Sequence, residues 1–256
     1  MILRENKYNM LELGAILAGI LQGIFEWLPI SSEGVISLFS HFFIKGVNSV
    51  DFSLVLHFGT LFAVLIYFFR DWINVLLYKN RFLFWFLAIS TLVSLILGFF
   101  VYKLINNLLV GNFLLLITGI GLLLTSFFQR KKIRIEINEK KLAVFVGILQ
   151  GLAVIPGLSR SGSTIFGLSF GKFSPSEILK ISYMMSVPVV FASSLYFYLK
   201  EPNLFSFSLE ALFFSFLTGI LTLHFLMKIS SKINFSKFTF IFGILCILGA
   251  LFGLVL

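Results

Sequence analysis

The chain has 256 residues, of which 59% are hydrophobic and 12% charged, and its formal net charge is +9. A soluble globule could not wet the surface of so apolar a chain, whose mean hydropathy is +1.03, so the composition predicts an integral membrane protein. The basic excess lies mostly in loops, where membrane topology accounts for it, so a nucleic-acid-binding protein is not expected.

About six apolar runs approach the ~20 residues that an α-helix needs to cross a bilayer. We expect transmembrane helices at residues 54–69, 82–104, 108–128, 178–199, 209–229 and 238–256. A cleavable signal peptide is not expected, because a mixed polar segment precedes the first apolar run and no small-residue cleavage pattern follows it. The single cysteine, Cys246, lies in the last of these runs and excludes an intramolecular disulfide.

Two other apolar segments are each interrupted by a proline. Residues 10–43 and 142–171 contain an apolar arm, then Pro29 or Pro156, then a short second arm rich in serine and glycine. Backbone that breaks at membrane depth must be buried in protein or line a water-filled cavity. Each segment is therefore predicted to form a re-entrant helical hairpin.

A repeated sequence relates the two hairpins. The residues GILQG begin at Gly19 and again at Gly147, half a chain length apart. Solenoid repeats recur every ~20 to 50 residues, so this spacing indicates two related halves instead. We expect a single membrane domain of two repeats, residues 1–128 and 129–256, each with a re-entrant hairpin and about three transmembrane helices.

The distribution of basic residues predicts how the chain is oriented. Lysine and arginine gather in residues 70–81, 129–141 and 227–237, and the positive-inside rule places these loops in the cytoplasm. An odd number of crossings in each repeat inverts the second half relative to the first, so the hairpins are expected to enter from opposite faces and to meet near the bilayer midplane. Both termini are then expected outside the cell membrane.

The first hairpin carries polar side chains that topology does not explain. Gln22 and Glu26 share a helix face because they are one turn apart, and an ionisable group in an apolar run costs about 2.5 to 3.5 kcal/mol on insertion scales. Ser31, Ser32 and Glu33 follow the proline closely, which points to a functional carboxylate. Two structural alternatives stay open: a carboxylate paired inside the bundle, and serines that only cap a helix.

The second hairpin carries the basic counterpart. Arg160 stands between Ser159 and Ser161, and the glycines around them allow a tight turn into a new helix whose free N–H groups face the hairpin tip. A helix N-terminus, flanking hydroxyls that include Thr164, and a guanidinium together predict a phosphate-binding site. The alternative is that Arg160 pairs with Glu26 only to lock the halves together.

The histidines lie in or near apolar runs, at His41, His57 and His224. A lone histidine among apolar residues is more often packed and hydrogen-bonded than catalytic. All three are therefore predicted to be packing residues, and none is included in the candidate site.

At these motifs the chain resembles a known family over nearly its whole length. The stretches QGIFEWLPISSEG, FSLVLHFGTLFAVL and PGLSRSGST look like the bacitracin-resistance family of undecaprenyl-diphosphate phosphatases. The resemblance implies a membrane hydrolase that converts a polyprenyl diphosphate carrier lipid to its monophosphate. It marks the acidic-motif positions, the hydroxyls after the proline and the phosphate-facing set as Gln22, Glu26, Ser31, Ser32, Ser159, Arg160, Ser161 and Thr164.

The chain departs from the family beside Gly34. The family typically has a histidine after this glycine and a small or hydroxyl residue before it, whereas this chain has Val35 and Glu33. The resemblance implies an acid/base or phosphate-binding role for that histidine. We therefore expect either that Glu33 takes over part of the role or that catalysis is weak.

The sequence as a whole predicts an all-α polytopic membrane protein with an inverted-topology repeat, about six transmembrane helices and two re-entrant helical hairpins, acting on polyprenyl diphosphates. Arg160 is expected to stabilise the charge that develops in phosphoryl transfer, Ser32 to be the nucleophile or to position water, and Glu26 to be the base or to hold Mg²⁺ or Ca²⁺. The expected substrate-binding residues are Gln22, Ser31, Glu33, Ser159, Ser161 and Thr164.

Two other functional classes remain open. One is a transporter that flips a polyprenyl phosphate with the same anion site and cleaves nothing, and the other is a purely structural membrane subunit. The expected partners are the lipid substrate and the surrounding membrane lipids, with a homodimer as an open option.

Overall fold

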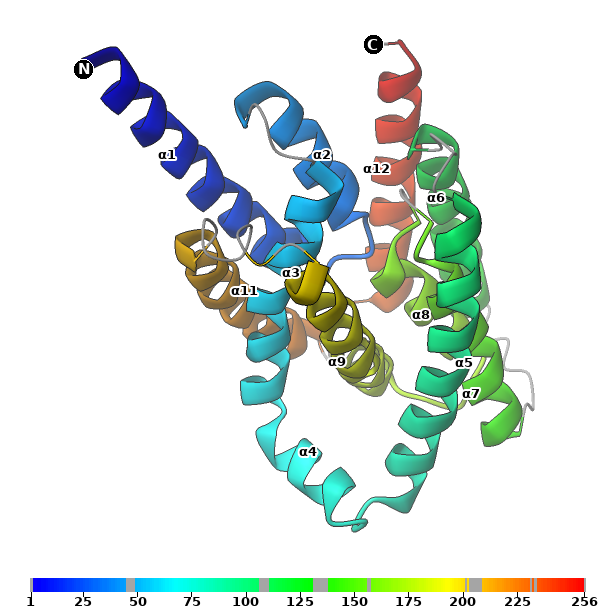
Figure 1. Cartoon of the computed structure of the whole chain (residues 1–256). Coiled ribbons are helices and arrows are strands. Elements are labelled where there is room, and N and C mark those ends of the chain that lie inside the picture. The colour runs from blue at the N-terminus through cyan, green and yellow to red at the C-terminus, as the bar shows by residue number, and fades with distance from the viewer. Residues whose placement is uncertain are drawn as a thin grey trace.

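The computed structural model describes residues 2–44, 49–105, 111–130, 138–155, 158–200, 202, 209–230, 232 and 234–255, and these are helical along most of their length (Figure 1). The helices of the first half are α1 (Ile2–Phe25), α2 (Ser32–Phe43), α3 (Ser49–Tyr67), α4 (Phe69–Leu76), α5 (Arg81–Ile105) and α6 (Gly111–Arg130). Those of the second half are α7 (Glu139–Leu152), α8 (Arg160–Leu168), α9 (Pro175–Lys200), α11 (Leu209–Ser230) and α12 (Phe235–Val255).

Several of these helices suit a membrane. Among the described residues, α5, α9 and α11 are long and apolar enough to cross one, and α3 with α4 adds a fourth span if this pair, bent by 77°, is counted as one. They correspond to the predicted spans at 54–69, 82–104, 178–199 and 209–229, so the prediction of an all-helical membrane protein is confirmed. The spans predicted at 108–128 and 238–256 overlap α6 and α12, which pack on each other, while residues 108–110 and 256 lie outside the described residues. The total of about six crossings stays a prediction.

Each predicted hairpin is a pair of helices joined by a short break. The first pair is α1 and α2, and the second is α7 and α8. Serine side chains start the second helix of each pair: Ser31 Oγ accepts from the Gly34 N–H at 3.2 Å, and Ser159 Oγ accepts from the Gly162 N–H at 3.1 Å. These N-caps explain why the chain can restart a helix directly after each break. Residues 156–157 of the second break lie outside the described residues.

The repeated GILQG sequence is a helix-packing motif in both copies. Its first glycine lies against the backbone of another helix: a Cβ added to Gly19 would come within 2.2 Å of the Ala211 carbonyl oxygen on α11, and one added to Gly147 within 2.7 Å of the Ser90 carbonyl oxygen on α5. Small residues spaced four apart allow such close approach between membrane helices. Both copies of the repeated sequence therefore provide a helix-packing surface.

The helix contacts repeat between the halves. α1 packs on α11 and α7 packs on α5, while α3 contacts α9 and α6 contacts α12. These contacts match when the halves are exchanged: replacing α1 by α7 and α11 by α5 turns the α1–α11 contact into the α7–α5 contact, and the α3–α9 and α6–α12 contacts are each unchanged. At the centre, Trp27, Tyr183 and Met184 are fully buried in a core to which α3, α5, α7, α8, α9 and α11 contribute.

The two ends of the chain lie on one side of the bundle. Figure 1 shows the N-terminal end of α1 and the C-terminal end of α12 at the top, with α4 and the turn into α5 at the bottom. The basic stretch 70–81 therefore lies opposite the termini, which is the relation that the charge distribution predicts.

Candidate active site

The break after α1 places a carboxylate inside the protein. Glu26 is the first residue beyond α1, and its side chain is only 3% exposed. Its N–H still donates to the Gln22 carbonyl at 3.0 Å, so the last helical turn carries it inward. The Gln22 side chain donates from Nε2 to Glu26 Oε2 at 2.8 Å, so the two residues share a face as their spacing predicts.

The two serines after the break have different tasks. Ser31 caps α2, in agreement with the structural alternative considered for it. Ser32, the first residue of α2, instead donates its hydroxyl to Glu26 Oε2 at 3.0 Å. A buried carboxylate within hydrogen-bond distance of a hydroxyl can take its proton, which is how a serine is activated as a nucleophile.

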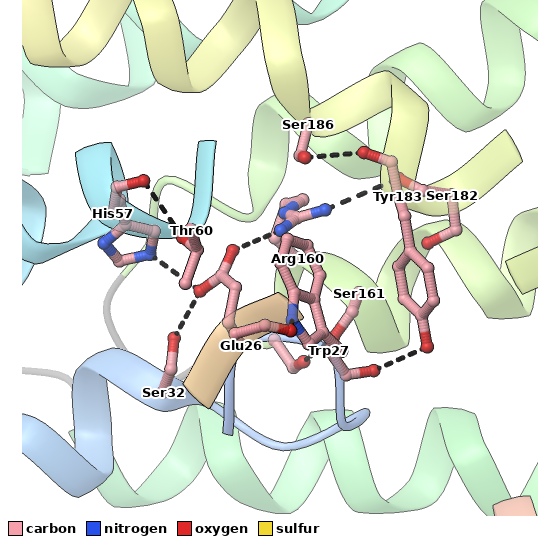
Figure 2. Close-up of polar contacts among 12 residues, drawn as sticks. Glu26, Trp27, Ser32, His57, Thr60, Arg160, Ser161, Ser182, Tyr183 and Ser186 are labelled. Carbon is pink, nitrogen blue, oxygen red and sulfur yellow. Dashed lines mark hydrogen bonds and ion pairs between the residues drawn. The ribbon is translucent and has the colours of Figure 1, made fainter. Parts of the chain in front are cut away.

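Arg160 reaches the same carboxylate from the other half of the chain. It is the first residue of α8, and its Nη2 forms an ion pair with Glu26 Oε1 while Nη1 donates to the Ser182 carbonyl at 3.4 Å. Figure 2 shows the Glu26 carboxylate between Ser32 on one side and the guanidinium on the other. Glu26 and Arg160, the two charged groups that are unfavourable to bury in a membrane, therefore contact each other although they lie in different halves of the chain.

The hydroxyls around Arg160 hold the second break in place. Ser159 caps α8, and its hydroxyl oxygen lies 3.2 Å from the hydroxyl oxygen of Ser161. Ser161 Oγ donates to the Leu28 carbonyl of the first break at 2.7 Å. Thr164 donates to the Arg160 carbonyl at 3.0 Å and contacts the hydroxyl of another helix, so it supports Arg160 from behind.

A small cavity of about 30 Å³ lies where the two breaks meet. This volume suits about one water molecule. Most of the predicted site residues line it, whereas Gln22 and Thr164 are fully buried outside its lining. The predicted residues that line it are Glu26, Ser31, Ser32, Glu33, Ser159, Arg160 and Ser161.

His57 also lines this cavity, although its sequence context predicts a packing residue. On α3, its Nε2 lies 3.1 Å from Glu26 Oε2 and its Nδ1 lies 2.7 Å from the Ser53 carbonyl oxygen. Two signals could have found it. His57 is a titratable residue in an apolar span, which is the criterion that selected Glu26, and it belongs to a stretch that carries the family resemblance.

His224 and Val35 lie outside the site. His224, on α11, is exposed and its ring lies edge-on to Tyr67 with 6.0 Å between ring centroids. The side chain of His41 lies outside the described part of the structure. Val35 is half-buried on α2 and does not line the cavity.

Trp27 fixes the position of the first break. Its indole N–H donates to the Gly219 carbonyl on α11 at 2.8 Å, and its own carbonyl accepts from the Tyr183 hydroxyl on α9 at 2.9 Å. The two rings meet edge to face with centroids 5.3 Å apart. These contacts hold the residue next to Glu26 on two helices of the second half.

The metal-ligand role considered for Glu26 stays a prediction, and both of its carboxylate oxygens have protein partners in this structure. Arg160 occupies Oε1, while Oε2 accepts from Gln22 and Ser32. Within the described ranges no three His, Cys, Asp or Glu side chains gather where they could hold a metal ion. Mg²⁺ and Ca²⁺ take several oxygen ligands, and Mg²⁺ commonly binds one or two carboxylates together with substrate phosphates.

Comparison with known proteins places this geometry in a family. The model of the family described as bacitracin resistance protein BacA matches residues 15–251. An undecaprenyl-diphosphatase of Methanococcoides burtonii is 34% identical over 91% of this chain and 96% of its own length. An undecaprenyl-diphosphatase of Desulforudis audaxviator is 32% identical over 87% of this chain and 90% of its own length. One of Haloarcula marismortui is 31% identical over 93% of this chain and 96% of its own length.

Proposed function

The chain belongs to the bacitracin resistance protein BacA family, and from that premise we propose that it hydrolyses an undecaprenyl-type polyprenyl diphosphate to the monophosphate and inorganic phosphate. Relatives that match along most of the chain are named undecaprenyl-diphosphatase. The reaction would return a lipid carrier to envelope glycan synthesis. The observation that carries the proposal is the convergence of Ser32 and Arg160, from opposite halves, on the buried Glu26 carboxylate.

Arg160 and the start of α8 form the proposed phosphate site. The guanidinium is a fork of N–H donors that suits phosphate oxygens, and a helix N-terminus adds free backbone N–H groups and a positive dipole end. Ser159 and Ser161 line the cavity at this end. The cavity of about 30 Å³ is too small for a phosphate group, so side chains around it must move when substrate binds. In the proposed complex, Arg160 leaves Glu26 and binds the phosphates.

Ser32 is the proposed nucleophile. Its Oγ attacks the terminal phosphorus, and its proton passes to Glu26 Oε2, which lies 3.0 Å away. The anhydride P–O bond breaks, and its electron pair leaves with the polyprenyl monophosphate. Water then attacks the phosphoserine and loses a proton to a base, while the proton on Glu26 returns to the Ser32 oxygen. Arg160 stabilises the charge on the transferred group in both steps.

The remaining predicted residues support these groups. Gln22 orients the Glu26 carboxylate, and Thr164 holds the Arg160 backbone. Ser31 starts the helix that presents Ser32. Glu33 lines the cavity, and its proposed role is to contact the bound substrate.

For the architecture we propose two inverted repeats, residues 1–128 and 129–256, with about six crossings and two re-entrant hairpins. The reciprocal contacts of α1 with α11 and of α7 with α5 support this, because a two-fold axis in the membrane plane would generate one pair from the other. Basic loops in the cytoplasm and both termini outside complete the proposal. A homodimer stays a prediction of the sequence analysis.

A phosphate-release assay tests the function. Purified protein in detergent is given undecaprenyl diphosphate, and inorganic phosphate and undecaprenyl monophosphate are both measured. We expect equal amounts of the two products. Arg160→Ala serves as the inactive control. Transport of a polyprenyl phosphate across vesicles without phosphate release would contradict the proposal and favour a flippase.

A further inference from the structure

His57 is held from both sides by oxygen atoms. Nδ1 lies 2.7 Å from the carbonyl oxygen of Ser53, one turn earlier on α3, and Nε2 lies 3.1 Å from Glu26 Oε2. The ring is 12% exposed, and Figure 2 shows it on the side of the carboxylate away from Arg160. The imidazole is therefore oriented, with one nitrogen turned to the helix backbone and the other to the site.

The partners of the ring determine where its hydrogens are. A backbone carbonyl can only accept, so Nδ1 carries a hydrogen. Nε2 faces a carboxylate oxygen, and this contact holds a second proton, because two acceptors without a hydrogen between them would repel each other. Nε2 and Glu26 Oε2 thus share a proton directly beside the Ser32 hydroxyl, which donates to the same oxygen.

The reaction needs a second group that can exchange a proton. Glu26 receives the proton of Ser32, which leaves the departing phosphate oxygen without a donor and the attacking water without a base. Arg160 does not release a proton in proteins, and the serine hydroxyls of the cavity are poor acids. Among the described residues that line the cavity, Glu33 and His57 remain, and His57 alone contacts Glu26.

We propose that His57 is the acid and base of this site for the leaving group and for water. As Ser32 Oγ bonds to phosphorus, Nε2 gives its proton to the oxygen of the departing polyprenyl monophosphate. In the second step, the neutral Nε2 takes a proton from the attacking water, and Glu26 returns its proton to Ser32 as the Ser32–phosphorus bond breaks. Both groups are then in their starting states, so the cycle balances. This role rests on the proposed phosphatase activity.

The decisive variant is His57→Gln, which keeps a side-chain N–H donor but cannot exchange a proton. General acid–base catalysis contributes about 10² to 10⁴ in rate, so we expect kcat to fall about 100-fold while KM changes less than about threefold. His224→Gln on α11 is the matched control, since it removes an exposed histidine outside the site, and it should keep the native rate. Thermal unfolding in detergent checks that each variant is folded.

Two further measurements separate proton exchange from mere support of Glu26. The native kcat should fall on the alkaline side as His57 loses its proton, and His57→Gln should lack that limb. The charged groups that face His57 are Glu26, Glu33 and, through the shared carboxylate, Arg160, and all are retained in the variant. In His57→Ala, free imidazole added to the assay should raise kcat at least about tenfold.

The outcomes are distinct. Native protein that releases phosphate, together with a folded His57→Gln variant within about threefold of native kcat, overturns the role of His57 and leaves the phosphatase proposal standing. A slow His57→Gln variant that keeps the alkaline limb, with no imidazole rescue of His57→Ala, also overturns it and makes His57 a structural support. No phosphate release by the native protein overturns both proposals.

Discussion

Gln22 and Gln150 occupy the same position in the two GILQG copies but bind different partners. Gln22 donates to Glu26 Oε2 at 2.8 Å, inside the candidate site. Gln150 donates to Ser94 Oγ on α5 and to the Met185 carbonyl on α9, each at 3.2 Å, and so ties α7 to two neighbouring helices. The glutamine of each copy is buried, but it orients Glu26 in the first half and joins helices in the second.

Replacing each glutamine by leucine should separate these roles. Gln22→Leu removes one of the hydrogen bonds that orient Glu26, so we expect kcat to fall about tenfold. This corresponds to about 1.4 kcal/mol in activation free energy, and the free energy of unfolding should change little. Gln150→Leu should lower the free energy of unfolding by about 1 kcal/mol, the net value of a typical hydrogen bond, and leave kcat near native. Phosphate release gives kcat, and thermal unfolding in detergent gives the change in stability. A loss of stability in Gln22→Leu together with a loss of kcat in Gln150→Leu would contradict these two roles.

Arg160→Lys should fail almost as badly as Arg160→Ala. A guanidinium binds phosphate as a fork, and an ammonium group cannot reproduce that geometry. Removing a donor aimed at developing charge costs about 10² to 10³ in kcat, and we expect that loss in phosphate release.

Glu26→Gln should also abolish turnover yet keep most substrate binding, which a polyprenyl phosphate competition assay can measure.

The structural alternative for this ion pair makes a different prediction. If Arg160 and Glu26 only lock the halves together, their variants should lose folded protein, and any folded fraction should still hydrolyse substrate. Folded Arg160→Lys with near-native phosphate release would remove Arg160 from the proposed phosphate site.

Glu33→Gln and Val35→His test what replaces the family histidine. The sequence suggests Glu33, whereas the structure places the His57 imidazole against Glu26. We expect Glu33→Gln to lower kcat by less than about tenfold, well below the effect of losing a general acid–base group. Val35→His should bring no gain, because residue 35 lies outside the cavity lining. A 100-fold loss in Glu33→Gln would instead support Glu33 as the replacement.

Gly147→Ala tests the packing role of the repeated motif. The added methyl would lie 2.7 Å from the Ser90 carbonyl oxygen, so α7 must move away from α5. Overpacking of this kind costs about 1 to 3 kcal/mol, and we expect a lower unfolding temperature in detergent. Gly121→Ala on α6 is the control, since its Cβ would meet nothing within 4 Å. Equal stability of the two variants would show that close approach at Gly147 is not required.

Cysteine labelling tests the orientation. In a Cys246→Ala background, Lys79→Cys places a thiol on the exposed basic stretch between α4 and α5. If this stretch faces the cytoplasm, a membrane-impermeant maleimide should label it only after the cells are permeabilised. Labelling in intact cells would reverse the proposed topology.

Much of this protein follows from local patterns in its sequence. Apolar runs predict the helices at residues 82–104 and 209–229 because a bilayer demands a continuous apolar length. The i, i+4 spacing of Gln22 and Glu26 predicts their contact, since one helical turn brings them together whatever the rest of the chain does. The serines before Gly34 and Gly162 predict helix starts for the same local reason.

The tertiary structure alone decided which contacts distant residues make in the site, and that His57 is part of it. Local spacing could place Glu26 and Arg160 on hairpin tips, but their ion pair spans the two halves and depends on how the helices pack. Packing also set the Thr164 hydroxyl against the Ser182 hydroxyl of α9, and turned His57 of α3 toward Glu26. A histidine in an apolar helix has the same sequence signature whether it faces lipid, core or cavity. Only the rotation of α3 against α1 and α2 distinguishes these, and that rotation is a property of the whole bundle.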